Sequence, residues 1–286
     1  MIKVISSGIY TSIQDLGRKG FASMGIPLAG VMDSYAAKFS NLLLHNNEND
    51  AVVEITFGAS KFEFLEDTVI CISGADFSPQ LNSEDISMNS LLAVKKGSVL
   101  TFGKRKYGVR SYLAIKGGFV AETVLKSKSY SKGITEKVVL KKGDIIFSNT
   151  NRSIVNNNNA KVRFQKEYLE TKTLEVSVGP EYELLSEKQR TSIENSMFTI
   201  SSSSSRMGYI LEEKLENDFL SMYSSGVLPG TVQLTPSGKL IVLMRDCQVT
   251  GGYPRVLQLS EQAINTLSQK TTGEKIQFKI KMLYKI

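Results

Sequence analysis

The sequence has little of the chemistry that most hydrolases and metalloproteins use. It contains one histidine and two cysteines among 286 residues. A multi-histidine metal site is therefore excluded, and any Ser-His-Asp or Cys-His scheme would have to use His45, which lies in an Asn-rich, loop-like segment. Cys71 and Cys247 lie far apart and match no CxxC or zinc-type spacing, so no metal ligand set is expected. Cys71 sits in an apolar run and is interpreted as a small buried residue.

Long apolar runs are missing as well. No stretch approaches the roughly 18 consecutive apolar residues of a membrane-spanning helix. The N-terminus passes directly into the polar residues Ser6 and Ser7 without the apolar core of a secretory signal. We therefore expect a cytoplasmic protein with no membrane contact.

Phosphate-binding and hydrolase motifs are also absent. The sequence has no P-loop, GxGxxG, GxSxG or HExxH motif. If a nucleotide is used, either its site is atypical or a partner supplies it.

Positive charge is in moderate excess, with 35 Lys and Arg against 28 Asp and Glu. The basic clusters at 95–96, 104–106 and 141–142 are short and lie beside strand-like runs. Exposed sheet edges and turns account for them, because lysine discourages edge-to-edge strand pairing. They lack the aromatic interleaving that stacks bases, so we do not expect nucleic-acid binding.

Most of the secondary structure that the sequence pattern predicts consists of short strands. The first two predicted strands, 51–57 and 61–65, flank Gly58-Ala59-Ser60 and are expected to form a hairpin. Short strands separated by glycine turns indicate barrels or sandwiches rather than a parallel sheet. Further short strands are predicted at 69–73, 97–102, 111–115, 145–147 and 240–244.

Helical patterns are fewer. Apolar residues recur at helical spacing over 32–43, and Asp33 is a suitable N-cap. Two more helices are predicted, one beginning near Ser186 and one over 260–267. The fold class is therefore mainly β with a few helices.

A polar, Asn-rich stretch near the middle marks a boundary between two halves of ordinary domain size. We predict an N-terminal β domain over 1–150, a linker over 151–165 and a C-terminal β domain over 166–286. Each half ends with a lysine-rich turn and a strand, at 141–147 and 272–278, which suggests two related β-barrels. The serine run 201–205 is predicted to be a loop.

Two polar groups in the first half are candidates for a site. Gln14, Asp15 and Arg18 lie close to two glycines that could bring backbone N–H groups near a ligand. Judged from the residue types alone, a turn held by an Asp15–Arg18 ion pair is favoured over a binding site. Asp76 follows a buried-looking strand, where it could act as a general base or simply cap the turn.

The most unusual group lies in the second half. The apolar strand 240–244 delivers Asp246 to its end, and glycine amides and a hydroxyl follow, which can form an anion-binding nest. Arg255 can clamp a carboxylate or phosphate with two hydrogen bonds. So many polar residues and glycines after a core strand favour a functional interpretation. The further candidate substrate-binding residues here are Thr231, Gln233, Thr250, Gly251, Gly252 and Tyr253.

These motifs, taken in order, resemble the family of allophanate hydrolase subunit 2, KipA and the C subunit of 5-oxoprolinase. The matching segments span nearly the whole chain, and the combination is specific although each motif alone is weak. They are the QDLGR motif at 14–18, PLAGVMD at 27–33, NLL at 41–43, EITFG at 54–58, RSYLAIKGG at 110–118, RMGY at 206–209, GTVQ at 230–233 and TGGYP at 250–254. One departure is the segment KSKSY at 126–130, where the family usually has GS-x-ST.

The resemblance implies two cyclophilin-like β-barrel domains and a hetero-oligomer, in which the partners are the KipI-like B subunit of 5-oxoprolinase and its A subunit. From the residues themselves we expect a site at the junction of the two halves that draws on Gln14, Asp15 and Arg18 and on 246–255. Asp246, Asp76 and Asp15 are the candidate catalytic residues, and the choice of general base among them stays open. The leading hypothesis is the C subunit of an ATP-dependent 5-oxoprolinase that hydrolyses 5-oxoproline to glutamate, with ATP bound by the complex or by this chain.

Two alternatives stay open. One is a KipA-like regulator that binds a KipI-type kinase inhibitor. The other is a carboxyltransferase half that acts on urea or a related amide through carboxybiotin, and only this reading requires biotin.

Overall fold

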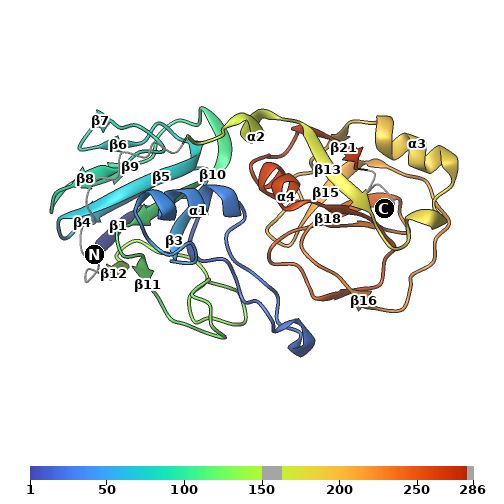
Figure 1. Ribbon diagram of the computed structural model, residues 1–286, viewed down its shortest axis with the longest axis horizontal. Coiled ribbons are helices and arrows are strands. Elements are labelled where there is room, and N and C mark those ends of the chain that lie inside the picture. The colour runs from blue at the N-terminus through green and yellow to red at the C-terminus, as the bar shows by residue number, and fades with distance from the viewer. Residues whose placement is uncertain (150–162, 282–286) are drawn as a thin grey trace. The chain divides into compact units, whose positions relative to one another are not determined.

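The computed structural model describes residues 1–149 and 163–281, which form two compact units (Figure 1). Unit 1 consists of Met1–Arg18 and Ala29–Glu170, and unit 2 consists of Lys19–Leu28 and Thr171–Ile286. Most of the predicted linker over 151–165 lies outside the described residues. The short segment Lys19–Leu28 belongs to unit 2, although it lies in the N-terminal half of the sequence. The predicted division into two consecutive domains did not include this exchange.

Unit 1 contains two β-sheets whose strand pairs are antiparallel. The seven-stranded sheet has the order β11 (Phe119–Val120), β12 (Ile145–Ser148), β1 (Ile2–Ser7), β4 (Ser60–Phe64), β9 (Val99–Thr101), β6 (Gln80–Leu81) and β7 (Glu84–Asp85). The five-stranded sheet has the order β2 (Tyr10–Gln14), β3 (Val52–Thr56), β10 (Tyr107–Ile115), β5 (Thr68–Asp76) and β8 (Leu92–Val94).

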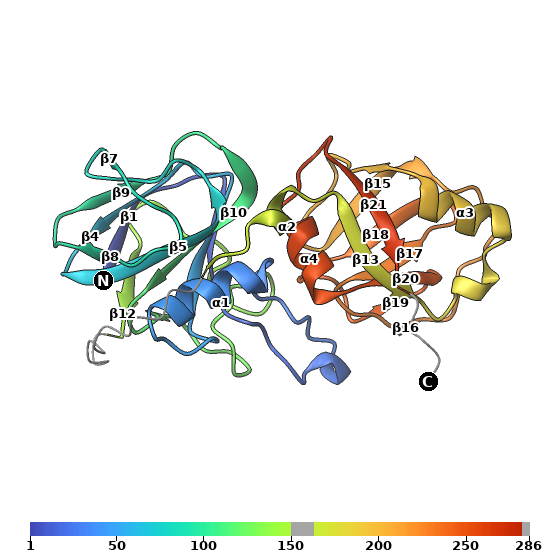
Figure 2. The same ribbon diagram turned by 45° about the horizontal axis from the view of Figure 1, so that its top comes forward.

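The five-stranded sheet of unit 1 is buried on both faces. Val53 and Ile55 belong to a large apolar core together with Phe62 and Phe64 of the seven-stranded sheet. Val52 belongs to a second apolar cluster with residues of α1 (Ser34–Leu43), the helix that lies against β5 and β10 (Figures 1 and 2). A strand buried on both sides has no reason to alternate polar and apolar residues, which explains the apolar run 69–72 of β5, where Ile70 and Ile72 face one cluster and Cys71 the other.

The predicted hairpin between β3 and β4 is wrong. β3 pairs with β2 and β10 in one sheet, whereas β4 pairs with β1 and β9 in the other. Phe57, Gly58 and Ala59 all have positive φ, near 60°, and carry the chain from one sheet to the other. A Cβ at Gly58 would lie 2.9 Å from the Phe77 ring, so the glycine is required by this corner and not by a two-strand turn.

The three predicted helices are confirmed, each with a side-chain cap. Asp33 accepts a hydrogen bond from Ala36 N at 3.0 Å at the start of α1. Ser186 caps α3 (Glu187–Asn195) through a capping box with Gln189. Ser260 caps α4 (Glu261–Ser268). A fourth, short helix, α2 (Glu167–Glu170), was not predicted, because four residues are too few to show helical spacing.

Unit 2 is built on one curved sheet that nearly closes on itself. Its two end strands, β14 and β15, are joined by an Ile200–Leu211 bridge and by a 2.9 Å hydrogen bond from Ser201 N to Ile210 O. The serine run 201–205 forms the loop between these strands, as predicted. The order of the strands is β14 (Phe198–Thr199), β21 (Lys275–Ile280), β13 (Thr173–Val178), β20 (Arg255–Leu259), β17 (Thr231–Leu234), β18 (Lys239–Leu243) and β15 (Gly208–Lys214).

Both lysine-rich endings form the strands that were predicted, but they pair differently. β12 of unit 1 runs antiparallel to β1, whereas β21 of unit 2 runs parallel to β13. The prediction of a mainly β protein with a few helices is confirmed. Over 1–149 and 163–281, the chain forms no helix with the length and apolar character that crossing a bilayer requires.

A separate two-stranded ribbon stands outside the barrel of unit 2. It consists of β16 (Ser225–Gly226) and β19 (Thr250–Gly251), which pair antiparallel. The second strand begins the TGGYP motif, so the ribbon carries candidate site residues.

Candidate functional site

Asp15 of the QDLGR motif is a buried carboxylate whose two oxygens are fully engaged. Only 3% of the residue is exposed. Oδ1 accepts from Gly17 N at 2.9 Å and from the hydroxyls of Ser127 and Ser129 at 2.6 Å each, and Oδ2 accepts from Lys128 N at 2.6 Å. The carboxylate thus holds the turn at 127–129 against its own loop. This arrangement gives it a positioning role.

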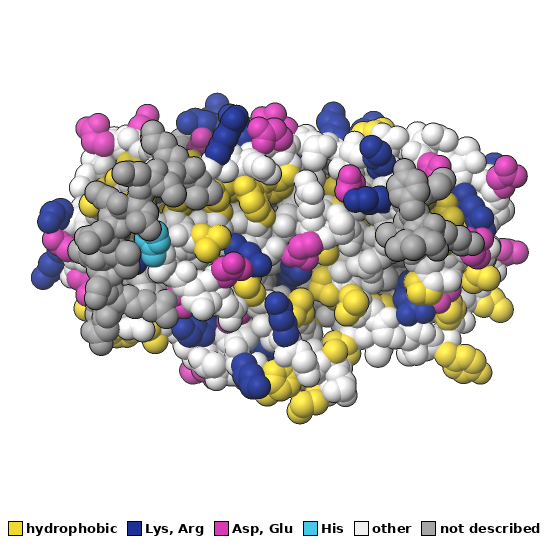
Figure 3. Space-filling view, viewed as in Figure 1, with side chains coloured by type: hydrophobic (Ala, Val, Ile, Leu, Met, Phe, Trp, Pro, Cys, Tyr) yellow, Lys and Arg dark blue, Asp and Glu magenta, His cyan; other side chains and the backbone are white. Residues whose placement is uncertain are grey.

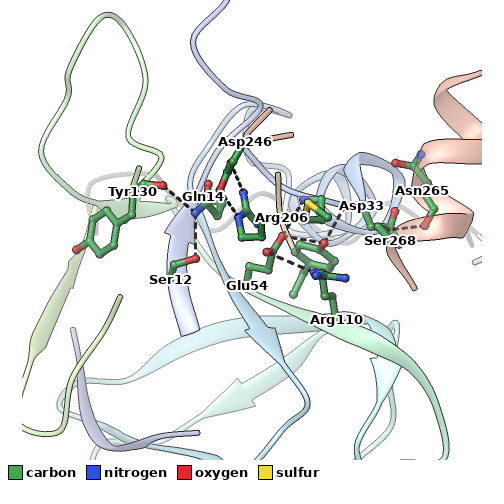
Figure 4. A network of polar contacts seen from close by, with 12 residues as sticks. Ser12, Gln14, Asp33, Glu54, Arg110, Tyr130, Arg206, Asp246, Asn265 and Ser268 are labelled. Carbon is green, nitrogen blue, oxygen red and sulfur yellow. Dashed lines mark hydrogen bonds and ion pairs between the residues drawn. The ribbon is translucent and has the colours of Figure 1, made fainter. Parts of the chain in front are cut away.

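Gln14 and Arg18 bind the same turn. The Gln14 amide is fully buried and donates to Ser12 Oγ at 3.0 Å and to Tyr130 O at 3.2 Å (Figure 4). Its Oε1 accepts no hydrogen bond from the residues that the structure describes. Arg18, 2% exposed, donates from Nη2 to Ser129 O. The three predicted residues of this motif are therefore brought together around 127–130, the segment that departs from the family pattern.

Asp76 lies apart from this group, at the end of β5. Its Oδ1 accepts from Ser78 N at 2.7 Å, and its Oδ2 lies 3.6 Å from Lys106 Nζ. These contacts match the turn-capping role that the sequence left open beside the general-base role.

A buried polar network that was not predicted as a site lies under the start of α1. Glu54 is fully buried, and its Oε2 accepts from Met32 N at 2.8 Å and from the Tyr112 hydroxyl at 2.9 Å. The Tyr112 oxygen accepts from Asp33 N at 2.8 Å, and Arg110 Nε lies 3.8 Å from Glu54 Oε1 (Figure 4). Three motifs of the family resemblance, at 27–33, 54–58 and 110–118, thus meet in one network.

The electrostatics of this network keep its phenols protonated. Burial raises the pKa of Tyr112 and of Tyr168 well above the ordinary value. The carboxylates Glu54 and Asp33 raise the pKa of Tyr112 further, and Asp33 raises that of Tyr168. The Tyr168 hydroxyl donates to Asp33 Oδ2 at 2.5 Å. Neutral donors facing buried carboxylates stabilise the packing of α1 on the sheet, so the signature residues here serve the fold.

In unit 2, Asp246 is held by a bidentate ion pair. Arg206 Nε donates to Oδ2 at 2.7 Å and Nη2 to Oδ1 at 3.0 Å (Figure 4). The backbone supports the pair, because Asp246 N donates to Arg206 O at 3.0 Å. The Asp246 side chain is 21% exposed, which leaves it accessible in the isolated chain.

Arg255 already has a carboxylate partner within this chain. Its Nε donates to Glu181 Oε2 at 2.9 Å and its Nη2 to Glu181 Oε1 at 2.7 Å, while Nη1 donates to Gly226 O at 3.0 Å. The side-chain hydrogen bonds lower the pKa of Glu181 and raise the pKa of Arg255. The fork predicted to clamp a substrate anion binds Glu181 and the ribbon instead.

The remaining predicted residues of unit 2 contact the ribbon or the neighbouring strand. Gln233, 1% exposed, donates to Tyr253 O at 3.3 Å, and a Cβ at Gly251 would lie 2.5 Å from Gln233 Nε2. Thr231 donates to Gln258 Oε1 at 2.8 Å. Thr250 pairs across the ribbon with Gly226, and Gly252 O accepts from Met222 N at 2.8 Å.

The structure thus brings Gln233, Gly251, Tyr253 and Arg255 together at the ribbon, with Asp246 in a separate ion pair. Sequence reasoning missed Glu181 and the two hydroxyls at Ser127 and Ser129. Glu181 lies in a turn before η2 (Tyr182–Leu184), where nothing in the sequence marks it as a partner of Arg255. The two serines were visible only as a departure from the family pattern.

The thiols and the lone histidine do not join any of these groups. Burial raises the pKa of both Cys71 and Cys247 to about 12, so neither is a thiolate near neutral pH. His45 is exposed just after α1. No group of three or more potential metal ligands occurs within 1–149 and 163–281. On the face shown in Figure 3, basic side chains are interspersed with acidic ones.

Comparisons with known proteins give the family and the fold. The family model for the carboxyltransferase domain, subdomain A and B, matches residues 24–280. A curated relative, the C subunit of 5-oxoprolinase from Escherichia coli (strain K12), is 34% identical over 97% of this chain and 90% of its own length.

Two solved structures superpose on nearly the whole chain. The TTHA0988 crystal structure has a TM-score of 0.87 at 24% identity, and the match covers 97% of this chain and 55% of that chain. The K. lactis urea amidolyase has a TM-score of 0.86 at 27% identity, with 97% of this chain and 18% of that chain covered. The chain therefore spans about half of the first structure and less than a fifth of the second.

Proposed function

Because the chain belongs to the carboxyltransferase domain family, subdomain A and B, we propose that it is the C subunit of an ATP-dependent 5-oxoprolinase. The observation that carries this proposal is the 34% identity to a 5-oxoprolinase C subunit over 97% of this chain and 90% of that relative. A match of this extent relates nearly the whole of both chains and not a shared module. The complex would open the cyclic amide of 5-oxoproline to glutamate with cleavage of ATP, in the cytoplasm.

The described residues support a division of labour. Asp246 is accessible and fixed by Arg206, so it is the candidate acid or base that this chain would offer. Asp15 and Asp76 hold turns, and Arg255 holds the ribbon. With no phosphate-binding motif in the sequence, ATP would be bound with the help of the A and B subunits.

The test is reconstitution of the purified chain with its A and B subunits. We expect 5-oxoproline consumption, glutamate formation and ADP release only when all three are present. The matched control is the Asp246→Asn chain, which keeps a hydrogen bond from Arg206 but loses the negative charge. A verified, folded complex that turns over no 5-oxoproline would overturn the proposal, and tight binding to the B subunit without turnover would point to a KipA-like regulator.

One observation favours a second candidate function. The K. lactis urea amidolyase contains the same fold at 27% identity, which suggests a carboxyltransferase half that moves a carboxyl group from carboxybiotin to urea. Both substrates are small amides. Biotin-dependent carboxylation of urea by the complex, in place of 5-oxoproline hydrolysis, would establish this alternative.

A further inference from the structure

Unit 2 contains an open cavity of about 380 Å³ between the end of α3 and the strands β13 and β21. This volume lies within the range of roughly 300–1,000 Å³ that is typical of small-molecule sites. The helix contributes Glu194 and Asn195 to the lining, and the strands contribute Thr173, Gln277 and Lys279. None of these five residues belongs to a motif of the family resemblance or to the predicted site residues. The cavity is therefore lined by residues that no function has yet been given.

The three strand residues of the lining lie on one face of the sheet. β21 pairs with β13 so that Gln277 lies opposite Thr173, and Lys279 follows Gln277 by two positions. Because side chains alternate along a strand, these three share a face. The end of α3 lies over the same face, since Gln277 Nε2 donates to Glu194 O at 3.1 Å, and α3 is seen beside β21 in Figure 1. Helix and sheet thus hold the polar groups in a fixed frame.

Charges of opposite sign line the cavity without pairing. The Glu194 carboxylate accepts a hydrogen bond from the Tyr182 hydroxyl at 3.3 Å. Neither Glu194 nor Lys279 forms an ion pair with any residue that the structure describes. The helix adds to the negative side, because its dipole places partial negative charge at the C-terminus and the last turn of α3 contains no basic residue. The helix end therefore attracts a cation, whereas Lys279 on the sheet attracts an anion.

We propose that this cavity binds a free α-amino acid as its zwitterion, with glutamate as the ligand. The ammonium group lies at the end of α3 beside Glu194, and a carboxylate lies beside Lys279 and the Thr173 hydroxyl. The Asn195 amide can donate to or accept from either group. A ligand with charge of one sign only would leave Glu194 or Lys279 without a counter-charge. The choice of glutamate rests on the proposed function, in which glutamate is the product and its cyclic precursor lacks the ammonium group.

The first test measures binding of L-glutamate to the isolated chain by calorimetry. We expect saturable binding. Glutarate keeps both carboxylates but has no ammonium group, and the nitrogen of 5-oxoproline is an uncharged amide. Each should bind at least about fivefold more weakly than glutamate, which corresponds to the loss of one partly exposed ion contact.

The second test uses charge-removing variants of the lining. Glu194→Gln and Lys279→Met should each weaken glutamate binding about fivefold. The matched controls are Glu187→Gln at the opposite end of α3 and Lys275→Met on the same face of β21, and both should bind glutamate as the wild type does. All four side chains are exposed, so the midpoint of thermal unfolding should be unchanged in every variant.

The outcomes separate this inference from the proposed function, because the isolated chain binds glutamate without needing the complex. The inference is overturned if glutamate does not bind, or if it binds to Glu194→Gln and Lys279→Met as tightly as to the wild type. Glutarate binding as tight as that of glutamate would also overturn it, since the ammonium group would then not be recognised. Turnover of 5-oxoproline by a complex whose chain binds no glutamate would remove this inference alone. Glutamate binding that follows the expected pattern, in a chain whose verified complex is inactive, would remove only the proposed function.

Discussion

Asp15 in unit 1 and Asp246 in unit 2 were both predicted to be catalytic, but their surroundings differ. Asp15 is 3% exposed and is surrounded by two hydroxyls and two backbone N–H groups. Asp246 is 21% exposed and is held by the two nitrogens of one arginine. Asp15 therefore satisfies buried donors of its own unit, whereas Asp246 lies beside a single cation and keeps part of its side chain in solvent.

The largest effect is expected from Asp15→Ala. We expect the free energy of unfolding to fall by about 3 kcal/mol or more, because several buried donors lose their acceptor together. Urea denaturation of the purified chain measures it. Asp85→Ala, at an exposed position in the same unit, should cost less than about 0.5 kcal/mol, and an equal loss in the two variants would contradict the structural role of Asp15.

Asp246→Ala should affect turnover more than it affects stability. We expect a loss of about 1–2 kcal/mol in unfolding free energy, since a partly exposed pair contributes modestly, and a far larger loss in turnover by the reconstituted complex. Denaturation and steady-state kinetics on the same preparation provide the measurements. Full turnover in this variant would remove Asp246 from the site.

A smaller effect, with a defined pH dependence, is expected from the Glu181–Arg255 pair. The hydrogen bonds from Arg255 lower the pKa of Glu181 below its ordinary value of 4.5. Its contribution to stability is therefore present above pH 4.5 and is lost as the pH falls through the lowered folded-state pKa.

Wild type and Glu181→Gln should accordingly differ in unfolding free energy near neutral pH and converge in acid. Denaturation curves from about pH 7 to 3 test this. A difference that grows as the pH falls would mean that the carboxylate is not stabilised by Arg255.

The smallest effect is expected at the thiols. Because burial raises the pKa of Cys71 and Cys247 to about 12, a thiol reagent at mildly alkaline pH should label neither in the native protein and both in denaturant. Stoichiometric labelling of the native chain would show that one of them is exposed.

Local features of the fold were predictable because a few neighbouring residues determine them. Asp33, Ser186 and Ser260 each precede a helical pattern and each caps the helix that follows. The corner at Phe57–Ala59 was not predictable, because a glycine between two strands looks the same whether the strands pair or enter different sheets. Which of the two occurs depends on Phe77 and on distant strands.

The candidate site was predictable in its residues but not in their partners. Gln14, Asp15 and Arg18 do act together, yet through a turn more than 100 positions away. Arg255 was identified as a two-pronged clamp, and it is one, but its anion is Glu181, 74 positions earlier. The residue types in a motif predict the kind of interaction, but the partner lies far away in the sequence and is known only from the folded structure.

The parallel pairing of β21 with β13 has a consequence for how the protein is made. β21 lies between β13 and β14 in the sheet although residues 275–280 are translated about a hundred residues after β13. Until these residues have emerged from the ribosome, both neighbouring strands have an open edge, which a holdase chaperone could cover. The sheet of unit 2 is therefore expected to be completed only after residue 280 has emerged, whereas the strands of unit 1 are all synthesised by residue 148.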